Sequence, residues 1–216
     1  MYTKKIVILA KSAKNNNFCV AGLANTGEWI RPISNNSEIE DAVPSDAIIF
    51  SDNTELKIFD VVEIHFKKNP VNNPIQPENF YYDERFFWKK INQISLEKII
   101  NWRGFDDREK IFYNYDREVD KNFVLKQKNR ESLLLLPIKN LIICIEERGY
   151  KKFYANFNYN GREYRRFSVG DIAVRENFRN YADGEYFYKK DAVVLFSLTN
   201  PYIHTNKCYK MLAQVF

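Results

Sequence analysis

The sequence predicts a mainly β fold, in the β-rich α+β class, built from two small β-barrels in tandem with a short helical or loop insertion between them. Short apolar or alternating segments recur in both halves of the 216 residues, and turn-forming residues separate them. Hydrophobic residues make up 45% of the chain and aromatic residues 16%, which is too much apolar surface for a disordered chain. The length suits two compact domains or one large domain.

The first half contains about five expected strands. Residues 4–11 predict a buried strand, because four consecutive aliphatic side chains are bounded by polar clusters. A turn at 15–17 follows, and then a hairpin of 18–23 and 29–33, in whose turn Gly27 supplies a positive φ. A short strand at 47–50 and an alternating strand at 56–66 complete this half.

A connecting segment separates the two halves. Three prolines between 70 and 77 predict an irregular connection, and the helical spacing of apolar residues from 91 to 100 predicts a short helix with Ser95 as its N-cap. We therefore expect a first barrel at 1–80, a helical and loop segment at 81–135 and a second barrel at 136–216.

The second half repeats the pattern of short strands. Asn160-Gly161 between two aromatic runs is the strongest hairpin signal in the chain. Asp60 and Asp171 each precede an apolar segment after a hairpin, which suggests an internal duplication. Residues 133–137 introduce this half, and strands are expected at 141–145, 150–158, 162–168, 170–174, 192–198 and 209–216. About five strands per half favour OB-type barrels, although PUA-like or SH3-like barrels leave much the same pattern.

Several blocks of sequence carry a family resemblance: 6–12 (IVILAKS), 19–22 (CVAG), 27–33 (GEWIRPI), 76–79 (QPEN), 196–199 (FSLT) and 209–213 (YKMLA). Together they resemble the prokaryotic family described as dual OB domain-containing proteins, and they cover most of the chain. The resemblance implies two OB folds in tandem and a nucleic-acid or nucleotide-ligand role inferred from that fold. It implies no established activity.

The positive charge is concentrated in the predicted hairpin of the second half. The stretch 148–167 holds six basic residues and one acidic residue, a local net charge of +5 that equals the net charge of the whole chain. Seven aromatic residues are interleaved with these cations, a combination that holds single-stranded nucleic acid by stacking and phosphate contacts. The candidate binding residues here are Tyr159, Arg162, Tyr164, Arg165 and Arg166. A barrel hairpin with a solvated basic face is the alternative interpretation.

Around the expected hairpin turn, cross-strand pairs follow from the two-residue loop. Tyr159 is expected to face Arg162, and Phe157 to face Tyr164. On the opposite side of the hairpin, Asn156 is expected to face Arg165.

Trp29 and Arg31 are candidate binding residues in the first half. They lie two apart on an expected strand, so an indole and a guanidinium share one face, where they stack a base and pair with phosphate. Lys11 adds a phosphate contact or is simply solvated. The alternative is that Trp29 fills the barrel and Arg31 forms a structural ion pair.

Gln76, Glu78 and Asn79 follow the proline-rich turn. Amide and carboxylate groups on a stiff loop either read base edges or a ribose hydroxyl, or bind loop amides that have no other partner. Both interpretations stay open from the sequence.

Signals for catalysis are few. The two histidines are far apart, no Cys/His spacing predicts zinc, and the glycines form neither a P-loop nor a dinucleotide fingerprint. Asp106, Asp107 and Glu109 either hold a metal ion or form a charged helix face. The three cysteines are far apart and predict buried reduced thiols. We expect no cofactor, no bound metal and, rather than an enzyme, a binding protein.

The expected function is non-catalytic binding of single-stranded DNA or RNA by aromatic stacking and basic phosphate contacts. The first alternative is a sensor of a nucleotide or modified base, held between the barrels by Trp29, Arg31 and the 76–79 loop. The others are a metal-dependent nucleic-acid-modifying enzyme and a protein-interaction module that uses the aromatic hairpin. The N-terminal sequence contains neither an export signal nor a membrane span, which predicts a cytoplasmic location. The oligomeric state is left open.

Overall fold

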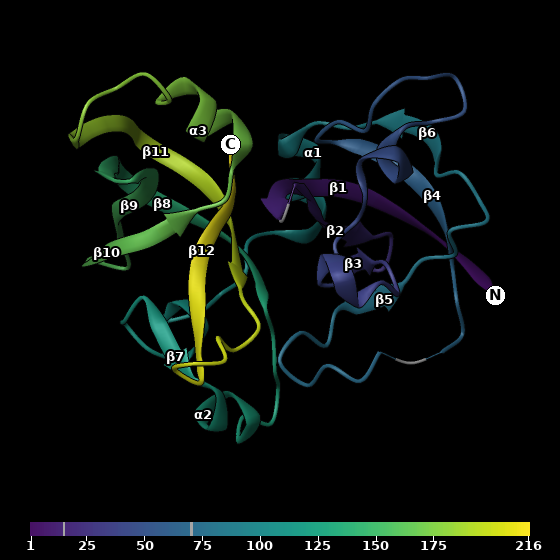
Figure 1. Cartoon of the computed structure of the whole chain (residues 1–216), viewed down its shortest axis with the longest axis horizontal. Coiled ribbons are helices and arrows are strands. Elements are labelled where there is room, and N and C mark those ends of the chain that lie inside the picture. Colours follow the sequence, from purple (N-terminus) through teal and green to yellow (C-terminus); the bar gives the residue numbers. More distant parts are fainter. Residues whose placement is uncertain (15, 70) are drawn as a thin grey trace. The chain divides into compact units, whose positions relative to one another are not determined.

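The computed structural model describes residues 1–14, 16–69 and 71–216, which form two compact units (Figure 1). The first unit comprises Met1–Asn73 and Glu78–Gly104, and the second comprises Pro74–Pro77 and Phe105–Phe216. The segment 81–135, expected as a connection, thus contributes residues to both units. The expected turn at 15–17 and the expected proline-rich connection include Asn15 and Pro70, which lie outside the described residues.

The first unit is a six-stranded sheet in the order β5-β3-β2-β1-β4-β6. The strands are β1 (Tyr2–Lys14), β2 (Asn17–Ala24), β3 (Trp29–Ile33), β4 (Asp60–Phe66), β5 (Asn79–Tyr81) and β6 (Lys89–Gln93). β5 runs parallel to β3. Just beyond β5 the chain meets the end of β4, where Asp83 N donates to His65 O at 2.8 Å. The strands β1 to β5 therefore form a closed barrel, in which their order is 1-2-3-5-4.

The second unit closes in the same order. Its strands are β7 (Glu118–Asp120), β8 (Leu133–Arg148), β9 (Tyr150–Tyr159), β10 (Arg162–Val169), β11 (Gly184–Leu198) and β12 (Lys207–Val215). They are arranged as β10-β9-β8-β11-β12-β7, and a parallel pairing of β10 with β12 closes the barrel. With β8 as strand 1, the closed order is again 1-2-3-5-4. Two closed five-stranded sheets of this order are two OB-type barrels, so the expected fold class is confirmed.

Short helices decorate the barrels. They are α1 (Leu96–Arg103), α2 (Lys121–Leu125) and α3 (Ile172–Asn177), with 3-10 turns η1 (Ser37–Ile39), η2 (Ser45–Ile48) and η3 (Ile111–Tyr113). The expected N-cap of α1 is confirmed, because the Ser95 hydroxyl accepts from Lys98 N at 3.3 Å. Among the described residues, no helix is both long enough and apolar enough to cross a bilayer.

Each barrel has its own core. The first core includes Ile6, Ile8 and Val62, and the second includes Phe157, Phe167 and Phe196. The aliphatic run at 6–9 is buried on both faces of β1, with side chains at most 4% exposed, as its lack of alternation predicts. The three cysteines carry free thiols; Cys144 and Cys208 are buried, whereas Cys19 is half-buried.

The hairpin prediction is confirmed at its turn, and β10 contains a bulge that the sequence did not predict. Asn160 and Gly161 have positive φ values of 49° and 74°, as a two-residue turn of this type requires. Arg162 pairs with Tyr159, and Tyr164 pairs with Phe157. The register then shifts before Phe167, which pairs with Ala155, so Arg165 and Arg166 together lie opposite Asn156 as a β-bulge. Arg166 N donates to Asn156 Oδ1 at 2.9 Å.

The strand expected at 170–174 is wrong, because α3 begins there. Asp171 caps this helix through Oδ1, which accepts from Val174 N at 3.1 Å. Its Oδ2 accepts from Gln214 Nε2 and Val215 N of β12, both at 2.7 Å. Since Asp60 begins strand β4, the two aspartates occupy different places in their barrels, and the duplication signal that they suggested is also wrong.

Two further strand predictions are corrected. The short strand expected at 47–50 is largely the 3-10 turn η2, which follows Pro44. The strand expected at 141–145 is longer than predicted, because it forms one continuous strand, β8, with the residues 133–137 that precede it. An irregularity between Lys139 and Ile142, where Asn140 has a φ of 52°, explains why the sequence pattern looks interrupted.

Candidate functional site

One side of β9 faces away from the barrel core. Phe153, Ala155 and Phe157 belong to the core cluster, so the alternate residues point outward. We call this outward surface, together with the outward side chains of β8, β10 and β11 beside it, the β9 face; its β9 members are Tyr150, Lys152, Tyr154, Asn156 and Asn158. The Tyr150 side chain is 66% exposed, and Lys152 Nζ lies 4.8 Å from its ring centroid. Since β9 is strand 2 of an OB barrel, this face corresponds to the surface on which OB folds bind oligonucleotides and oligosaccharides.

The bulge in β10 brings Arg166 onto the β9 face. Arg166 has a φ of 60° and its guanidinium carbon lies 4.5 Å from the Tyr154 ring centroid. It also pairs with Glu146 of β8, where Nη2 donates to Oε2 at 3.1 Å. The hydrogen bonds that Arg166 donates to Glu146 raise the pKa of Arg166, so the guanidinium stays charged. A charged planar group stacked on a ring is a surface that suits a base and its phosphate.

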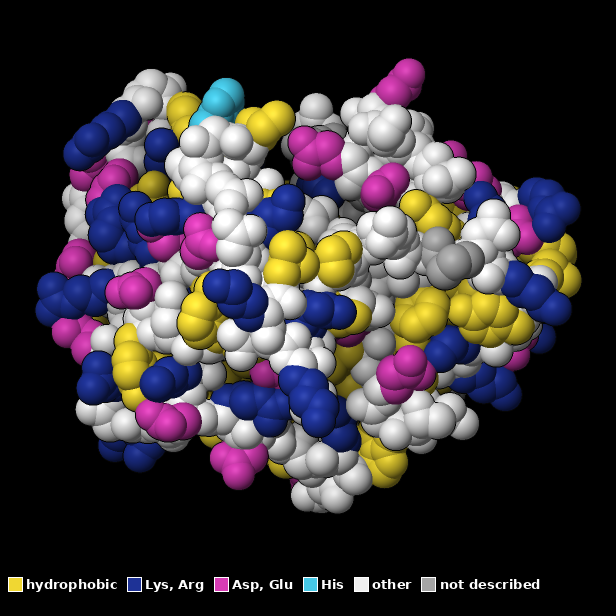
Figure 2. Space-filling model, turned by 90° about the horizontal axis from the view of Figure 1, so that it is seen from below, with side chains coloured by type: hydrophobic (Ala, Val, Ile, Leu, Met, Phe, Trp, Pro, Cys, Tyr) yellow, Lys and Arg dark blue, Asp and Glu magenta, His cyan; other side chains and the backbone are white. Residues whose placement is uncertain are grey.

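Acidic residues neutralise much of the positive charge of this hairpin. Glu146 pairs with Arg166, and Arg165 Nη2 lies 2.7 Å from Glu163 Oε2. In the described part of the chain, Lys139, Arg148 and Lys152 form no ion pair with an acid. Figure 2 shows one face of the molecule, on which Lys and Arg side chains likewise lie among Asp and Glu side chains. The local charge of the sequence is therefore not a continuous basic field in the fold.

A groove of about 910 Å³ lies at the Asn158 end of the β9 face. In the sheet, Lys139 is the register partner of Asn158 on one side and of Asp191 on the other. Lys139, Asn158 and Asp191 all line the groove. The rest of its polar lining comes from Asn140, Asn160 and Glu163, and Phe216 adds an aromatic ring. Amide, ammonium and carboxylate groups thus line one hollow, which offers both donors and acceptors to a ligand.

Two of the predicted stacking rings lie inside the second barrel. Tyr159 is 7% exposed and Tyr164 is 1% exposed. Tyr159 donates its hydroxyl hydrogen to Arg108 O, and burial raises the pKa of both phenols. Arg162 stacks on Tyr115, with 3.9 Å between the guanidinium carbon and the ring centroid. Of the five hairpin candidates, Arg165 and Arg166 are the ones that the structure places on the β9 face.

The first-barrel candidates Trp29 and Arg31 are buried. Trp29 is 9% exposed and lies beneath Arg103, whose guanidinium carbon is 4.8 Å from the ring. Arg31 is 5% exposed and its Nη1 donates to Asn79 Oδ1 at 3.4 Å. Burial lowers the pKa of Arg31, and the charge of Glu78 opposes that shift. Arg31, Glu78 and Asn79 come together where β3 and β5 close the barrel, which favours the structural interpretation of both sequence blocks.

Lys11 and Gln76 also make internal contacts. Lys11 Nζ lies 2.8 Å from Glu55 Oε1 and donates to Leu56 O at 3.0 Å. Gln76 Nε2 donates to Leu198 O at 2.9 Å, within the second unit. Because Glu78 and Asn79 belong to the first unit, the expected polar loop at 76–79 is divided between the two units.

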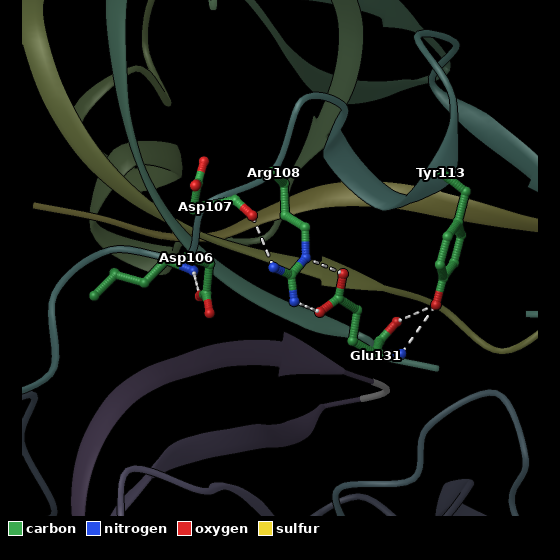
Figure 3. A network of polar contacts seen from close by, with 6 residues as sticks. Asp106, Asp107, Arg108, Tyr113 and Glu131 are labelled. Atoms are coloured by element: carbon green, nitrogen blue, oxygen red, sulfur yellow. Dashed lines mark hydrogen bonds and ion pairs between the residues drawn. The ribbon is translucent and has the colours of Figure 1, made fainter. Parts of the chain in front are cut away.

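The acidic cluster at 106–109 has its own partners (Figure 3). Asp106 Oδ2 accepts from Leu135 N at 2.7 Å, and Glu109 accepts from the Tyr115 hydroxyl at 2.6 Å. Arg108 binds Glu131 through two hydrogen bonds of 2.7 and 2.6 Å. Figure 3 shows the Asp106 and Asp107 carboxylates pointing away from each other. Within the residues that the structure describes, no group of three or more His, Cys, Asp or Glu side chains is arranged to hold a metal ion.

The sequence contained a signal for the residues that were missed. Tyr150, Lys152 and Tyr154 alternate with the core residue Phe153 in a strand, so the period of two assigns them to the face opposite the core. The prediction used the number of cations and rings in the hairpin without separating its two faces. It therefore included the buried residues Tyr159 and Tyr164 instead.

The topology and the cores define a protein made of two OB-type barrels in one chain. A family model for a dual OB-containing domain matches residues 4–215, so the chain belongs to that family and the resemblance is confirmed. No curated protein and no solved structure shows a significant match to the chain.

Proposed function

We propose that the chain binds single-stranded nucleic acid, RNA or DNA, on the β9 face and performs no chemistry on it. The observation that carries this proposal is the alternation of Tyr150, Lys152 and Tyr154 on the outward side of strand 2 of an OB barrel. Outward residues follow each other at about 7 Å along a strand. The result is a track of ring, cation and ring, with Arg166 stacked beside its inner end.

The expected energetics follow from these groups. Base–ring stacking contributes about 1–3 kcal/mol per base, as judged by alanine substitution. Lys139, Arg148 and Lys152 are the cations of this face that hold no acidic partner among the described residues. Three phosphate contacts to a single strand correspond to a slope of about −2 in a plot of log K against log salt. Binding should therefore depend on salt only moderately and on the rings strongly.

The test is fluorescence anisotropy of labelled oligo-dT, oligo-rU and duplex DNA, each about 20 nucleotides long, across a salt series with the full chain. We expect the single strands to bind more tightly than the duplex. Tyr150→Ala/Tyr154→Ala should weaken binding by about 30-fold or more, because two stacking contacts are lost. Phe123→Ala, which removes an exposed ring from α2, is the matched control and should bind like the unaltered chain. Absence of binding at low salt, or equal losses in the two variants, would refute the proposal.

The groove beside Asn158 favours a second candidate, a sensor of a free nucleotide or modified base. Its volume of about 910 Å³ and its amide lining suit one nucleotide. Calorimetric titration with the four nucleoside monophosphates distinguishes the candidates. Micromolar binding that Asn158→Ala removes, with little dependence on salt and no binding of oligonucleotides, would favour the sensor.

A further inference from the structure

β11 has one free edge over its first half. Residues 184–191 lie along β8 on one side, whereas β12 pairs only with Val194–Leu198. Among the described residues, no second strand covers this edge and no loop amide bonds to it. Every second residue of the edge therefore has an N–H and a C=O that no neighbouring strand pairs, as in a strand before another strand is added.

The residues that follow α3 form a wall beside this edge. A groove of about 600 Å³ is lined by Asn177, Phe178 and Tyr181 on one side and by the β11 residues 185–188 on the other. Ring centroids are 5.4 Å apart for Phe178 and Tyr188, and 5.0 Å apart for Tyr181 and Tyr186. Tyr181 is 47% exposed and Phe187 is 66% exposed. The unpaired backbone and an aromatic groove thus lie side by side.

The groove has a positive end. Lys189 and Lys190 follow it directly on β11, and neither forms an ion pair within the described residues. Arg179, at the other wall, is already paired with Glu176 at 3.4 Å. Two unpaired ammonium groups just beyond one end of this aromatic groove, whose lining also includes Glu185, favour a ligand with a negative charge at that end.

We infer that the edge of β11 and this groove bind an extended peptide that adds a strand to the second barrel. A strand edge requires donors and acceptors in alternation, which a polypeptide backbone supplies and a phosphodiester backbone does not. Side chains of the added strand alternate, so every second one enters the Phe178 and Tyr181 groove. The peptide therefore has apolar residues at alternate positions and an acidic residue beside Lys189 and Lys190. This inference is independent of nucleic-acid binding on the β9 face.

The experiment selects peptides on the full chain from a random library of about 12 residues displayed on phage, long enough to cover one edge strand. Synthetic copies of the enriched peptides are then titrated calorimetrically. Their sequences should alternate apolar and polar residues and carry an acidic end. Two N-methylated versions of each peptide are compared, one methylated at the odd-numbered amides and one at the even-numbered amides. Only one of these two sets of N–H groups faces β11, so methylation of that set should weaken binding by about tenfold or more, and methylation of the other set much less.

Three variants of the chain make the test specific. Tyr181→Ala should weaken peptide binding by about tenfold and leave oligonucleotide binding unchanged. Lys189→Glu/Lys190→Glu should select peptides with a basic end instead of an acidic one. Phe123→Ala serves again as the exposed-ring control.

Several results would overturn the inference. One is a selection whose enriched peptides do not alternate apolar and polar residues. Another is equal binding of the two N-methylated versions of a peptide. A loss of oligonucleotide binding in Tyr181→Ala without any peptide binding would assign the groove to the nucleic acid. A dimer in light scattering that Tyr181→Ala dissociates would show that a second copy of the chain occupies the edge.

Discussion

The two barrels share one strand order but differ in the outward faces of their first two strands. In the first barrel, Val7, Leu9 and Leu23 alternate with core residues, yet none is more than 4% exposed. In the second barrel the corresponding strands present Glu146, Tyr150 and Lys152 outward. These outward side chains are aliphatic in the first barrel, whereas those of the second barrel combine rings with charges.

In these barrels the strand order and the chemistry of the outward side chains carry separate information. The OB strand order specifies where a ligand face lies, and the residues at the outward positions decide whether that face suits a ligand. In this chain the second barrel carries the ring and cation chemistry. The most specific sequence block, 27–33, instead supplies Trp29 and Arg31 to buried contacts of the first barrel.

A second contrast concerns one buried cation in each barrel. Arg31 is buried near the opposite charge of Glu78. Lys210 of β12 is 1% exposed, and its Nζ donates to Ile111 O, Asn114 O and Asn114 Oδ1. Because a guanidinium keeps its proton in proteins whereas an ammonium can lose it, only the second barrel should respond to mild alkali.

The largest effect is expected for Arg31→Ala. The alanine variant loses the buried guanidinium, while Glu78 and Asn79 stay buried beside its former position. This loss should lower the free energy of unfolding by about 3–5 kcal/mol. Urea titration followed by circular dichroism measures this change. Arg31→Lys is the control, since it retains the charge but not the planar donor group, and its loss should be smaller. A loss below about 1 kcal/mol in the alanine variant would contradict the structural role.

The next effect is a pH dependence of stability due to Lys210. Burial lowers its pKa to about 7 in the folded state from 10.5. Between these values the unfolded state binds more protons, so the free energy of unfolding should rise with pH, by at most about 1.4 kcal/mol per pH unit. The rise should begin above the folded-state pKa and end near 10.5. Denaturant titrations between about pH 7.5 and 9.5, where the two states differ most in protonation, measure it.

Lys210→Met is the matched variant for this pH dependence. It fills much of the same volume without a titratable group, so its stability should lack the alkaline rise. An identical slope in Lys210→Met, or a flat profile in the unaltered chain, would show that Lys210 does not change protonation on folding.

A smaller effect is expected from Asp171, which ties α3 to β12. Asp171→Ala removes an N-cap and leaves Val215 N without its acceptor, which should cost about 1–3 kcal/mol. Hydrogen exchange should show faster exchange at Val174 and Val215 than in the unaltered chain. Asp171→Asn, which keeps one oxygen acceptor, should lose less. Unchanged exchange at Val215 would contradict the assigned contact.

The elements predicted correctly from the sequence are those with local signals. The bounds of β3 match the expected 29–33, and the Asn160-Gly161 turn sets the pairs nearest to it. The error at 170–174 has a distant cause, because Asp171 binds Gln214 and Val215, which are more than 40 residues away. No window along the chain contains that contact.

The candidate site was predicted in part for similar reasons. The hairpin itself and Arg166 were identified, but a bulge after Tyr164 changes which residues of β10 face outward. The positive charge was overestimated, because Glu146 reaches Arg166 only through the pairing of β8 with β9. Sheet pairing, which the sequence does not display, thus decided both the exposed rings and the net charge of the face.

The smallest effect, and the sharpest contrast with Arg31, is expected for the two arginines of β10. Arg165 is exposed and pairs with a neighbouring exposed acid, so Arg165→Ala should change the free energy of unfolding by less than about 0.5 kcal/mol. Arg166→Ala should also be mild in stability, yet it removes the guanidinium stacked on Tyr154, so oligonucleotide binding should weaken about threefold to tenfold. Parallel urea and anisotropy titrations separate the two quantities. If Arg166→Ala unfolds the chain as Arg31→Ala is expected to, or if Arg165→Ala and Arg166→Ala weaken binding equally, the stacked pair has no special part in the β9 face.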